Sequence, residues 1–151
     1  MSDGEALAGA IVRAASAADY PALCAAAALC DPTLRDALPD AATFALRARE
    51  RSALVAVHDE AIIGYLLASP LAYDGDAPRS LWVEAVAVVP AWRRRGLATV
   101  LCGAFAAAAR SHGTQALLTG PPADPVLAAL LTHVGFVTHR DGVLLWRLDE
   151  S

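Results

Sequence analysis

One segment near the middle of the chain reads Val88-Val89-Pro90-Ala91-Trp92-Arg93-Arg94-Arg95-Gly96-Leu97-Ala98-Thr99. Its apolar start is typical of a buried strand, and Pro90 ends that strand because proline cannot donate to a ladder of hydrogen bonds. From Leu97 onwards the apolar residues recur with a period of about 3.6, so we expect a helix to about Ser111. The segment therefore predicts a buried strand that passes through an arginine-rich turn into the start of a helix.

The junction between this strand and this helix is suited to binding phosphate. The first N–H groups of a helix have no intrahelical acceptor, and the helix dipole places partial positive charge there. Gly96 and Ala98 lack bulk, so phosphate oxygens can approach the main chain, and the three preceding arginines add cationic charge. The chain has neither the Gly-Lys-Ser/Thr ending of a Walker A loop nor a G-x-G-x-x-G motif. We therefore expect a phosphorylated cofactor of another kind, the alternative being a solvated basic turn without a ligand.

The residues before this segment predict an alternation of strands and helices. We expect strands at residues 10–15, 52–58, 61–68 and 80–89, one helix from a cap at residues 16–19 to residue 29, and another from residue 32 to about residue 39. The two residues Asp59-Glu60 join the second and third strands, which predicts a hairpin.

The residues after the segment continue the alternation. They predict a strand at residues 115–119, a helix at residues 125–133 opened by Asp124-Pro125, and a hairpin of residues 136–139 and 143–148 across Asp141-Gly142. The whole pattern indicates a single α/β (α+β) domain with a mixed, mostly antiparallel sheet flanked by about four helices. We expect residues 1–8 to form an N-terminal tail and residues 9–149 to form the domain.

Composition excludes several classes of protein. With 151 residues, 56% hydrophobic and 19% charged, the chain fits one folded domain and not a disordered tail. A net charge of −4 and the absence of lysine argue against a nucleic-acid partner. The longest uncharged apolar run, about residues 22–30, is too short to cross a membrane, and the first residues lack the features of a signal peptide. We therefore expect a cytoplasmic protein without a membrane partner.

The cysteines and histidines do not form a metal-binding pattern. Cys24, Cys30 and Cys102 are odd in number and show no C-x-x-C spacing, and no histidine lies at ligand spacing from another or from a cysteine. We expect free thiols in a reducing compartment and no metal site.

The arginine-rich segment resembles the signature loop of the GNAT superfamily of N-acetyltransferases. That family has Gln/Arg-x-x-Gly-x-Gly/Ala, and this chain has Arg93-x-x-Gly96-x-Ala98, preceded by Val-x-Pro and followed by an amphipathic helix. The strand and helix around Ala18-Asp19-Tyr20-Pro21 are similar to the family's first strand and helix. Residues 124–136, which end in Gly135-Phe136, are similar to its Asn…Ala…Tyr…Gly-Phe segment, so the resemblance covers residues 9–148.

This resemblance implies acetyl-coenzyme A as the cofactor and assigns residues to it. The loop's main-chain amides would hold the pyrophosphate, and the main chain of the preceding strand would pair with the pantetheine amides. The implied cofactor-binding residues are Val86, Ala87, Val88, Arg93, Arg94, Arg95, Gly96, Leu97, Ala98, Thr99 and Asp124.

Two positions depart from the family's pattern. The tyrosine that many members use to reprotonate the departing thiolate is Leu131 here, which leaves the general acid unassigned. The asparagine that often contacts coenzyme A is Asp124, for which a role as a helix cap is the alternative.

Glu84 is the candidate catalytic base. It lies within an otherwise apolar strand, where burial would tune a carboxylate for proton transfer near neutral pH, and related members often carry a glutamate on this strand. The alternative is that Glu84 faces solvent near the start of the strand.

The resemblance implies transfer of an acetyl group from acetyl-coenzyme A to a primary amine of a small molecule or a peptide, by direct attack. The two rival interpretations are a coenzyme A-binding module with weak or no catalysis, which the absent tyrosine favours, and an acyltransferase with a longer acyl donor, for which Ala85 and Ala87 would leave room. The sequence leaves a homodimer open.

Overall fold

The computed structural model describes residues 9–74, 77–122 and 125–149 of the chain, without the side chains of residues 72–78. The expected tail, residues 1–8, and Asp124 lie outside the described residues. Within these ranges no helix is long and apolar enough to cross a membrane. The same ranges hold no group of three side chains that could ligate a metal ion, and the three cysteines are free.

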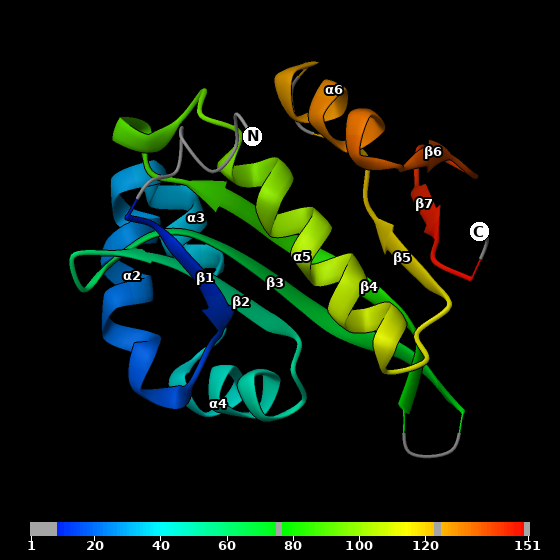
Figure 1. Ribbon diagram of the computed structural model, residues 1–151, viewed down its shortest axis with the longest axis horizontal. Helices are drawn as coiled ribbons and strands as arrows, with labels where there is room; N and C mark the ends of the chain where they lie inside the picture. The colour runs from blue at the N-terminus through cyan, green and yellow to red at the C-terminus, as the bar shows by residue number, and fades with distance from the viewer. Residues whose placement is uncertain (1–8, 75–76, 123–124, 150–151) are drawn as a thin grey trace.

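One seven-stranded sheet in the described residues organises the fold, with the strand order β1-β2-β3-β4-β5-β7-β6 (Figure 1). Neighbouring strands are antiparallel except β4 and β5, which are parallel. The strands are β1 (Ile11–Ala14), β2 (Ala53–His58), β3 (Ala61–Asp74), β4 (Ala77–Val88), β5 (Ala116–Thr119), β6 (Val137–Thr138) and β7 (Leu144–Arg147). The expected mixed, mostly antiparallel sheet is therefore confirmed.

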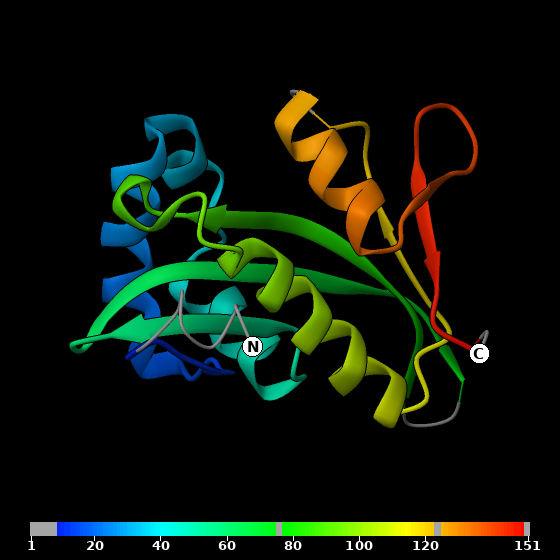
Figure 2. The ribbon, with the colours of Figure 1, turned by 45° about the horizontal axis from the view of Figure 1, so that its top comes forward.

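Helices cover both faces of this sheet (Figures 1 and 2). The described helices are α2 (Tyr20–Cys30), α3 (Pro32–Ala37), α4 (Ala41–Arg49), α5 (Leu97–Ser111) and α6 (Pro125–Val134), with short 3-10 turns η1 (Ala17–Asp19) and η2 (Pro90–Trp92). Helix α5 lies on one face, while α2, α3 and α4 lie on the other. Helix α6 packs against α5 beside the C-terminal strands.

Helix α4 was not expected from the sequence. Its N-cap is Asp40, whose carboxylate accepts a hydrogen bond from the N–H of Thr43 at 2.8 Å. An acidic cap followed by alanines is a recognisable helix start, so the Asp40-Ala-Ala-Thr pattern was the available signal.

Two tight turns have residues with positive φ, one in the two-residue hairpin loop 59–60 and one in the three-residue hairpin loop 140–142. Asp59 and Glu60 have φ of 48° and 66°, and Asp141 and Gly142 have φ of 51° and 80°. In the two-residue loop, positive φ at both central residues matches the twist of the flanking strands. These turns join β2 to β3 and β6 to β7, as the sequence predicts.

Helix α5 lies close to the sheet because Gly64 has no side chain. A Cβ at Gly64 would lie 3.1 Å from the carbonyl oxygen of Ala87 and 3.1 Å from a methyl group of Leu97. Leu97, Leu101 and Phe105 of α5 are all almost fully buried against the sheet. The start of α5 is therefore fixed by direct contact with β3 near the start of that strand.

Replacing Gly64 with alanine tests this contact. We expect Gly64→Ala to lower the free energy of unfolding by about 1–3 kcal/mol, because the added methyl group must displace either β4 or α5. The matched control is Gly103→Ala in α5, where a Cβ meets nothing within 4 Å. That variant should raise the free energy of unfolding by roughly 0.5–1 kcal/mol, since alanine favours a helix interior. Denaturant unfolding of both variants measures the difference, and equal effects of the two changes would contradict this packing.

Candidate functional site

The parallel pair β4 and β5 separates soon after it begins. Its register covers only Ser80↔Ala116, Leu81↔Leu117 and Trp82↔Leu118, although β4 continues to Val88. Just beyond the register, the Thr119 hydroxyl donates to the carbonyl of Val83 at 3.0 Å. From there to Val88, no β5 residue pairs with β4 in the described chain, so the last part of β4 presents an open edge.

The direction of the main chain along this open edge follows from the pairing of β4 with β3. The N–H of Val89 donates to the carbonyl of Ile63 on the β3 side at 2.9 Å. Successive residues of a strand direct their backbone groups to opposite edges, and the register is regular from Gly64↔Val88 to Leu67↔Ala85. Val86 and Val88 therefore direct their N–H and carbonyl groups to the open edge, whereas Ala87 directs its groups to β3.

The open edge leads to the arginine-rich loop and the start of α5. The N-cap residue Gly96 has φ of 82°, and no side chain caps the helix. Arg94 also has a positive φ, 65°, which is uncommon for a residue with a side chain. The N–H groups of Leu97, Ala98 and Thr99 lie in the first turn, where a helix has no acceptor of its own. The geometry is that of an anion-binding helix start.

Trp92 restrains the loop through two contacts. Its ring lies 4.8 Å from the ring of His58, at the end of β2, measured between centroids. The guanidinium carbon of Arg95 lies 4.6 Å from the Trp92 ring on which it packs. These contacts leave the charged end of Arg95 exposed beside the helix start while its position is restrained.

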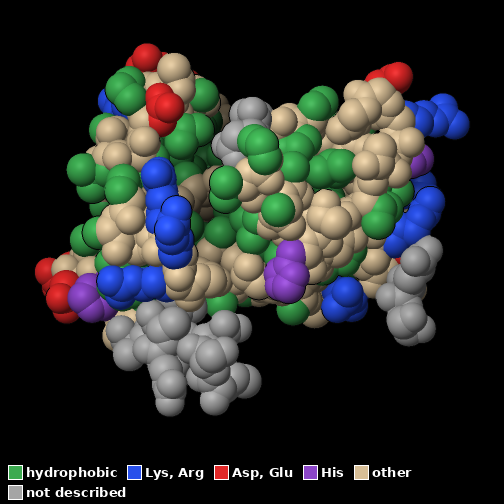
Figure 3. Space-filling view, turned by 90° about the horizontal axis from the view of Figure 1, so that it is seen from above, with side chains coloured by type: hydrophobic (Ala, Val, Ile, Leu, Met, Phe, Trp, Pro, Cys, Tyr) green, Lys and Arg blue, Asp and Glu red, His purple; other side chains and the backbone are tan. Residues whose placement is uncertain are grey.

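Arg93 ties the loop to both β4 and α2. Its Nε donates to the carbonyl of Val88 at 2.9 Å. Its guanidinium also faces the thiol of Cys30: burial raises the pKa of Cys30, and the nearby Arg93 partly opposes that shift. The side chains of Arg93, Arg94 and Arg95 are all exposed, so their charges are available to a ligand. Figure 3 shows this face hollowed between two lobes, with arginine side chains along one side of the hollow.

Glu84 is exposed, so of the two alternatives for this residue the structure supports the solvent-facing side chain and not the buried one. Its side chain is 41% exposed, and its Oε1 lies 3.6 Å from Nε of Arg47 in α4. The pairing of β4 with β3 explains the exposure of Glu84. The register steps from Leu67↔Ala85 to Ala68↔Val83, so Glu84 has no partner in β3. A bulge of this kind re-aims a side chain. It places Glu84 on the same face as Ala85, towards α3.

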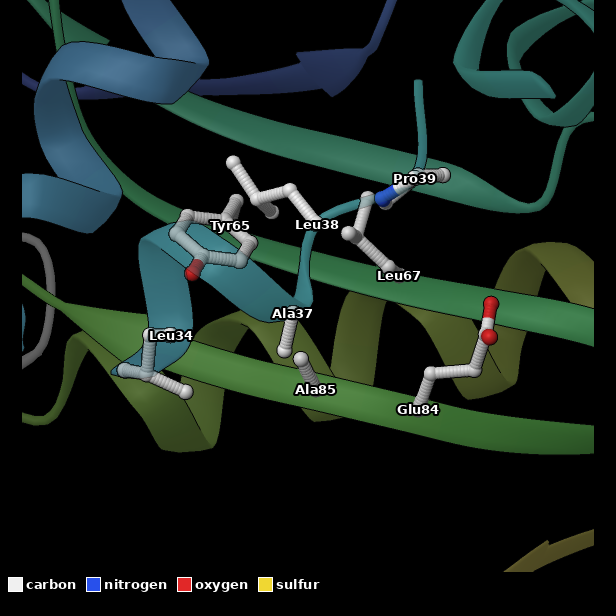
Figure 4. Close-up of a pocket in the computed structure, with 8 residues that line it drawn as sticks. All are labelled: Leu34, Ala37, Leu38, Pro39, Tyr65, Leu67, Glu84 and Ala85. Carbon is white, nitrogen blue, oxygen red and sulfur yellow. The ribbon is translucent and has the colours of Figure 1, made fainter. Parts of the chain in front are cut away.

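Glu84 lies at the rim of a cavity of about 80 Å³ between α3 and the sheet (Figure 4). The lining is apolar apart from Glu84 and one hydroxyl group. It consists of Leu34, Ala37, Leu38, Pro39, Tyr65, Leu67, Glu84 and Ala85. The cavity is therefore next to the open edge of β4, on the face that α3 covers.

Tyr65 is the functional candidate that the sequence did not reveal. Its side chain is fully buried, and its hydroxyl group has no hydrogen-bond partner in the described chain. Burial raises the pKa of Tyr65 to about 12, with a smaller contribution from Cys30. In the sequence, a tyrosine within an apolar strand looks like an ordinary core residue.

Leu131 lies in α6 and is 3% exposed. The structure therefore shows a buried leucine packed into the core at this position.

Comparisons with known proteins agree with this geometry. The model of the acetyltransferase (GNAT) family matches residues 18–136, and no curated protein matches by sequence. The ribosomal-protein-S18-alanine N-acetyltransferase of Escherichia coli superposes with a TM-score of 0.73 and 16% identity, covering 94% of this chain and 96% of that one.

Two further solved structures were determined with a coenzyme A species. The PaiA N-acetyltransferase of Thermoplasma acidophilum, in complex with coenzyme A, has a TM-score of 0.69 and 12% identity, and covers 91% of this chain and 98% of that one. The GphF GNAT-like decarboxylase, in complex with isobutyryl-CoA, has a TM-score of 0.72 and 21% identity, and the match covers 91% of this chain and 99% of that one. At these identities the likeness concerns the fold.

The contact between Arg93 and Cys30 gives a test of how the loop packs on α2. The guanidinium favours the thiolate, so removing it in Arg93→Ala should raise the pKa of Cys30 further. The pH profile of Cys30 alkylation, followed by peptide mass spectrometry, should then move to higher pH. Arg94→Ala, which removes a neighbouring exposed arginine, is the control and should leave the profile in place. An unchanged profile in Arg93→Ala would show that the loop does not contact α2 in this way.

Proposed function

The chain belongs to the acetyltransferase (GNAT) family, and from this premise we propose that it moves an acetyl group from acetyl-coenzyme A to a primary amine of a small molecule or peptide. Members of the family transfer acyl groups from coenzyme A to amines, and the chain carries the fold in a single domain. The observation that carries the proposal is the open edge of β4, which leads directly to the uncapped start of α5.

The residues at this site fit the chemistry of coenzyme A. A pantetheine arm contains amide groups, and the main-chain groups of Val86 and the N–H of Val88 are directed to the open edge where such amides would pair, while the Val88 carbonyl accepts from Arg93. A diphosphate is anionic, and the N–H groups of Leu97, Ala98 and Thr99 with the exposed arginines would hold it. Gly96 at φ 82° lets the main chain turn closely around such a group.

Acetyl-coenzyme A, when bound, supplies an activated thioester whose acyl carbon an amine can attack. The chain's own contribution is mainly positioning: the open edge fixes one reactant, and the neighbouring cavity receives the other. A typical alkylamine is protonated at neutral pH, so a proton must leave the nitrogen before it can attack. Glu84, at the rim of the cavity, would accept this proton directly or through a water molecule. Its 41% exposure lets the proton pass on to solvent.

No side chain needs to replace the absent phenol at Leu131. A model thiol has a pKa of about 8.5, so the thiolate of coenzyme A is a tolerable leaving group from the thioester near neutral pH. The buried Leu131 instead contributes packing between α6 and the core.

Glu84→Gln tests the proposed base in an assay of thiol release from acetyl-coenzyme A against a panel of amines. The amide keeps the shape but cannot accept the proton, so we expect turnover to fall by at least about 100-fold while coenzyme A affinity stays unchanged. Glu50→Gln is the matched control, because the Glu50 carboxylate also lies beside Arg47, at 3.7 Å, but does not line the cavity.

The same assay separates the proposal from its rivals. Coenzyme A binding without thiol release from any acyl donor would identify a binding module instead of a transferase. Faster release from a longer acyl-coenzyme A than from acetyl-coenzyme A would identify a different donor.

A further inference from the structure

The cavity beneath α3 contains an unsatisfied hydrogen-bonding group. The Tyr65 side chain is 0% exposed, and its hydroxyl group has no partner among the described residues. Figure 4 shows the ring between Leu38 and Leu34, with the hydroxyl directed away from β3 towards Leu34 and β4. A buried polar group without a partner costs free energy, so native structures seldom keep one without a reason.

The chain does satisfy a comparable phenol nearby. Tyr20, in α2, donates its hydroxyl to the carbonyl of Pro39 at 2.6 Å. Pro39 also lines the cavity, so main-chain acceptors exist in this region and Tyr65 does not use one. The Tyr65 hydroxyl therefore retains an unused hydrogen bond, which a molecule that enters the cavity and reaches this buried group can accept.

The chemistry of the lining restricts what that molecule is. Glu84 is the one charged residue among those that line the cavity, and its carboxylate, which lies 3.6 Å from Nε of Arg47, is the lining group that attracts an ammonium group. The remaining walls are aliphatic and suit a carbon chain. Because burial raises the pKa of Tyr65 to about 12, the phenol keeps its proton and acts as a donor rather than as an acid. A purely aliphatic ligand would leave this donor unsatisfied.

We propose that the acceptor is a small primary amine whose carbon chain carries an oxygen, and that the Tyr65 hydroxyl donates a hydrogen bond to that oxygen. This inference rests on the proposed function, since it assigns the cavity to the acceptor. Tyr65 is then a specificity-determining residue, and Glu84 faces the reacting nitrogen at the other end of the same molecule.

The register gives the spacing, along the sheet, of the backbone positions that carry Tyr65 and Glu84, and this spacing sets the scale of the probe. Tyr65 pairs with Ala87, and Leu67 pairs with Ala85 next to Glu84. Two residues of a strand span roughly 7 Å. A chain of four methylene groups between nitrogen and oxygen has a comparable length, so 4-amino-1-butanol is the suitable probe. Pentylamine, in which a methyl group replaces the hydroxyl, is the matched analogue.

The experiment compares kcat and KM for these two amines in the wild type, in Tyr65→Phe and in Tyr20→Phe. We expect the wild type to prefer 4-amino-1-butanol by at least about tenfold in kcat/KM, because the analogue leaves the hydroxyl unpaired. Tyr65→Phe should remove the preference through KM, with kcat little changed and coenzyme A affinity retained. Tyr20→Phe should keep the preference, although it unfolds at a lower temperature because it loses the bond to Pro39.

Several results would overturn the inference. They are the absence of a preference in the wild type, a preference that persists in Tyr65→Phe, and an equal loss in Tyr20→Phe. A lower coenzyme A affinity of Tyr65→Phe with the preference intact would assign the hydroxyl to the cofactor instead.

A stability measurement separates this inference from the proposed transfer. If neither amine is acetylated, the melting temperature of the coenzyme A-loaded protein is measured with each amine. A larger rise with 4-amino-1-butanol in the wild type, absent in Tyr65→Phe, would support the cavity assignment while the proposed transfer fails. Equal rises would overturn the inference as well.

Discussion

The separation of β4 from β5 is the feature on which the rest of the site depends. Two parallel strands that stayed paired to their ends would satisfy each other's main-chain groups and leave no place for a ligand. Here the pairing ends at Trp82↔Leu118, and a side-chain bond from Thr119 to Val83 closes it. The last residues of β4 are thereby held by β3 on one edge only, so the sheet stays rigid while its other edge is open.

Helix α5 turns this open edge into a site for an anionic ligand. Its first turn lies at the end of β4 because Gly64 lets Leu97 and Leu101 reach the sheet. The loop between them is restrained by Trp92, packed with His58, and by Arg93, bonded to Val88. A helix start is a weak anion site when it moves freely, and these contacts fix its position relative to the strand.

The parts of the fold that were predictable are those with a local signal. The strand, loop and helix of residues 88–111 show clear changes of period, and the hairpin at Asp59-Glu60 follows from a two-residue turn between apolar runs. Helix α4 was missed although Asp40 carries a capping signal.

The features that the sequence does not reveal are tertiary. The bulge that turns Glu84 towards α3 arises from its register with β3, so the apolar strand pattern alone could not decide between a buried and an exposed side chain. The unsatisfied hydroxyl of Tyr65 likewise depends on what surrounds it, because the residue type and its neighbours in the chain resemble any core strand.

We propose above all that the open edge of β4 and the start of α5 bind coenzyme A together. Residue-resolved hydrogen exchange of the amides, measured by NMR with and without coenzyme A, tests it most directly. The account predicts slower exchange at Val86, Val88 and Ala98 on binding and little change at Ala87, which already faces β3. Exchange at Val86, Val88 and Ala98 that stays the same with saturating coenzyme A would contradict it.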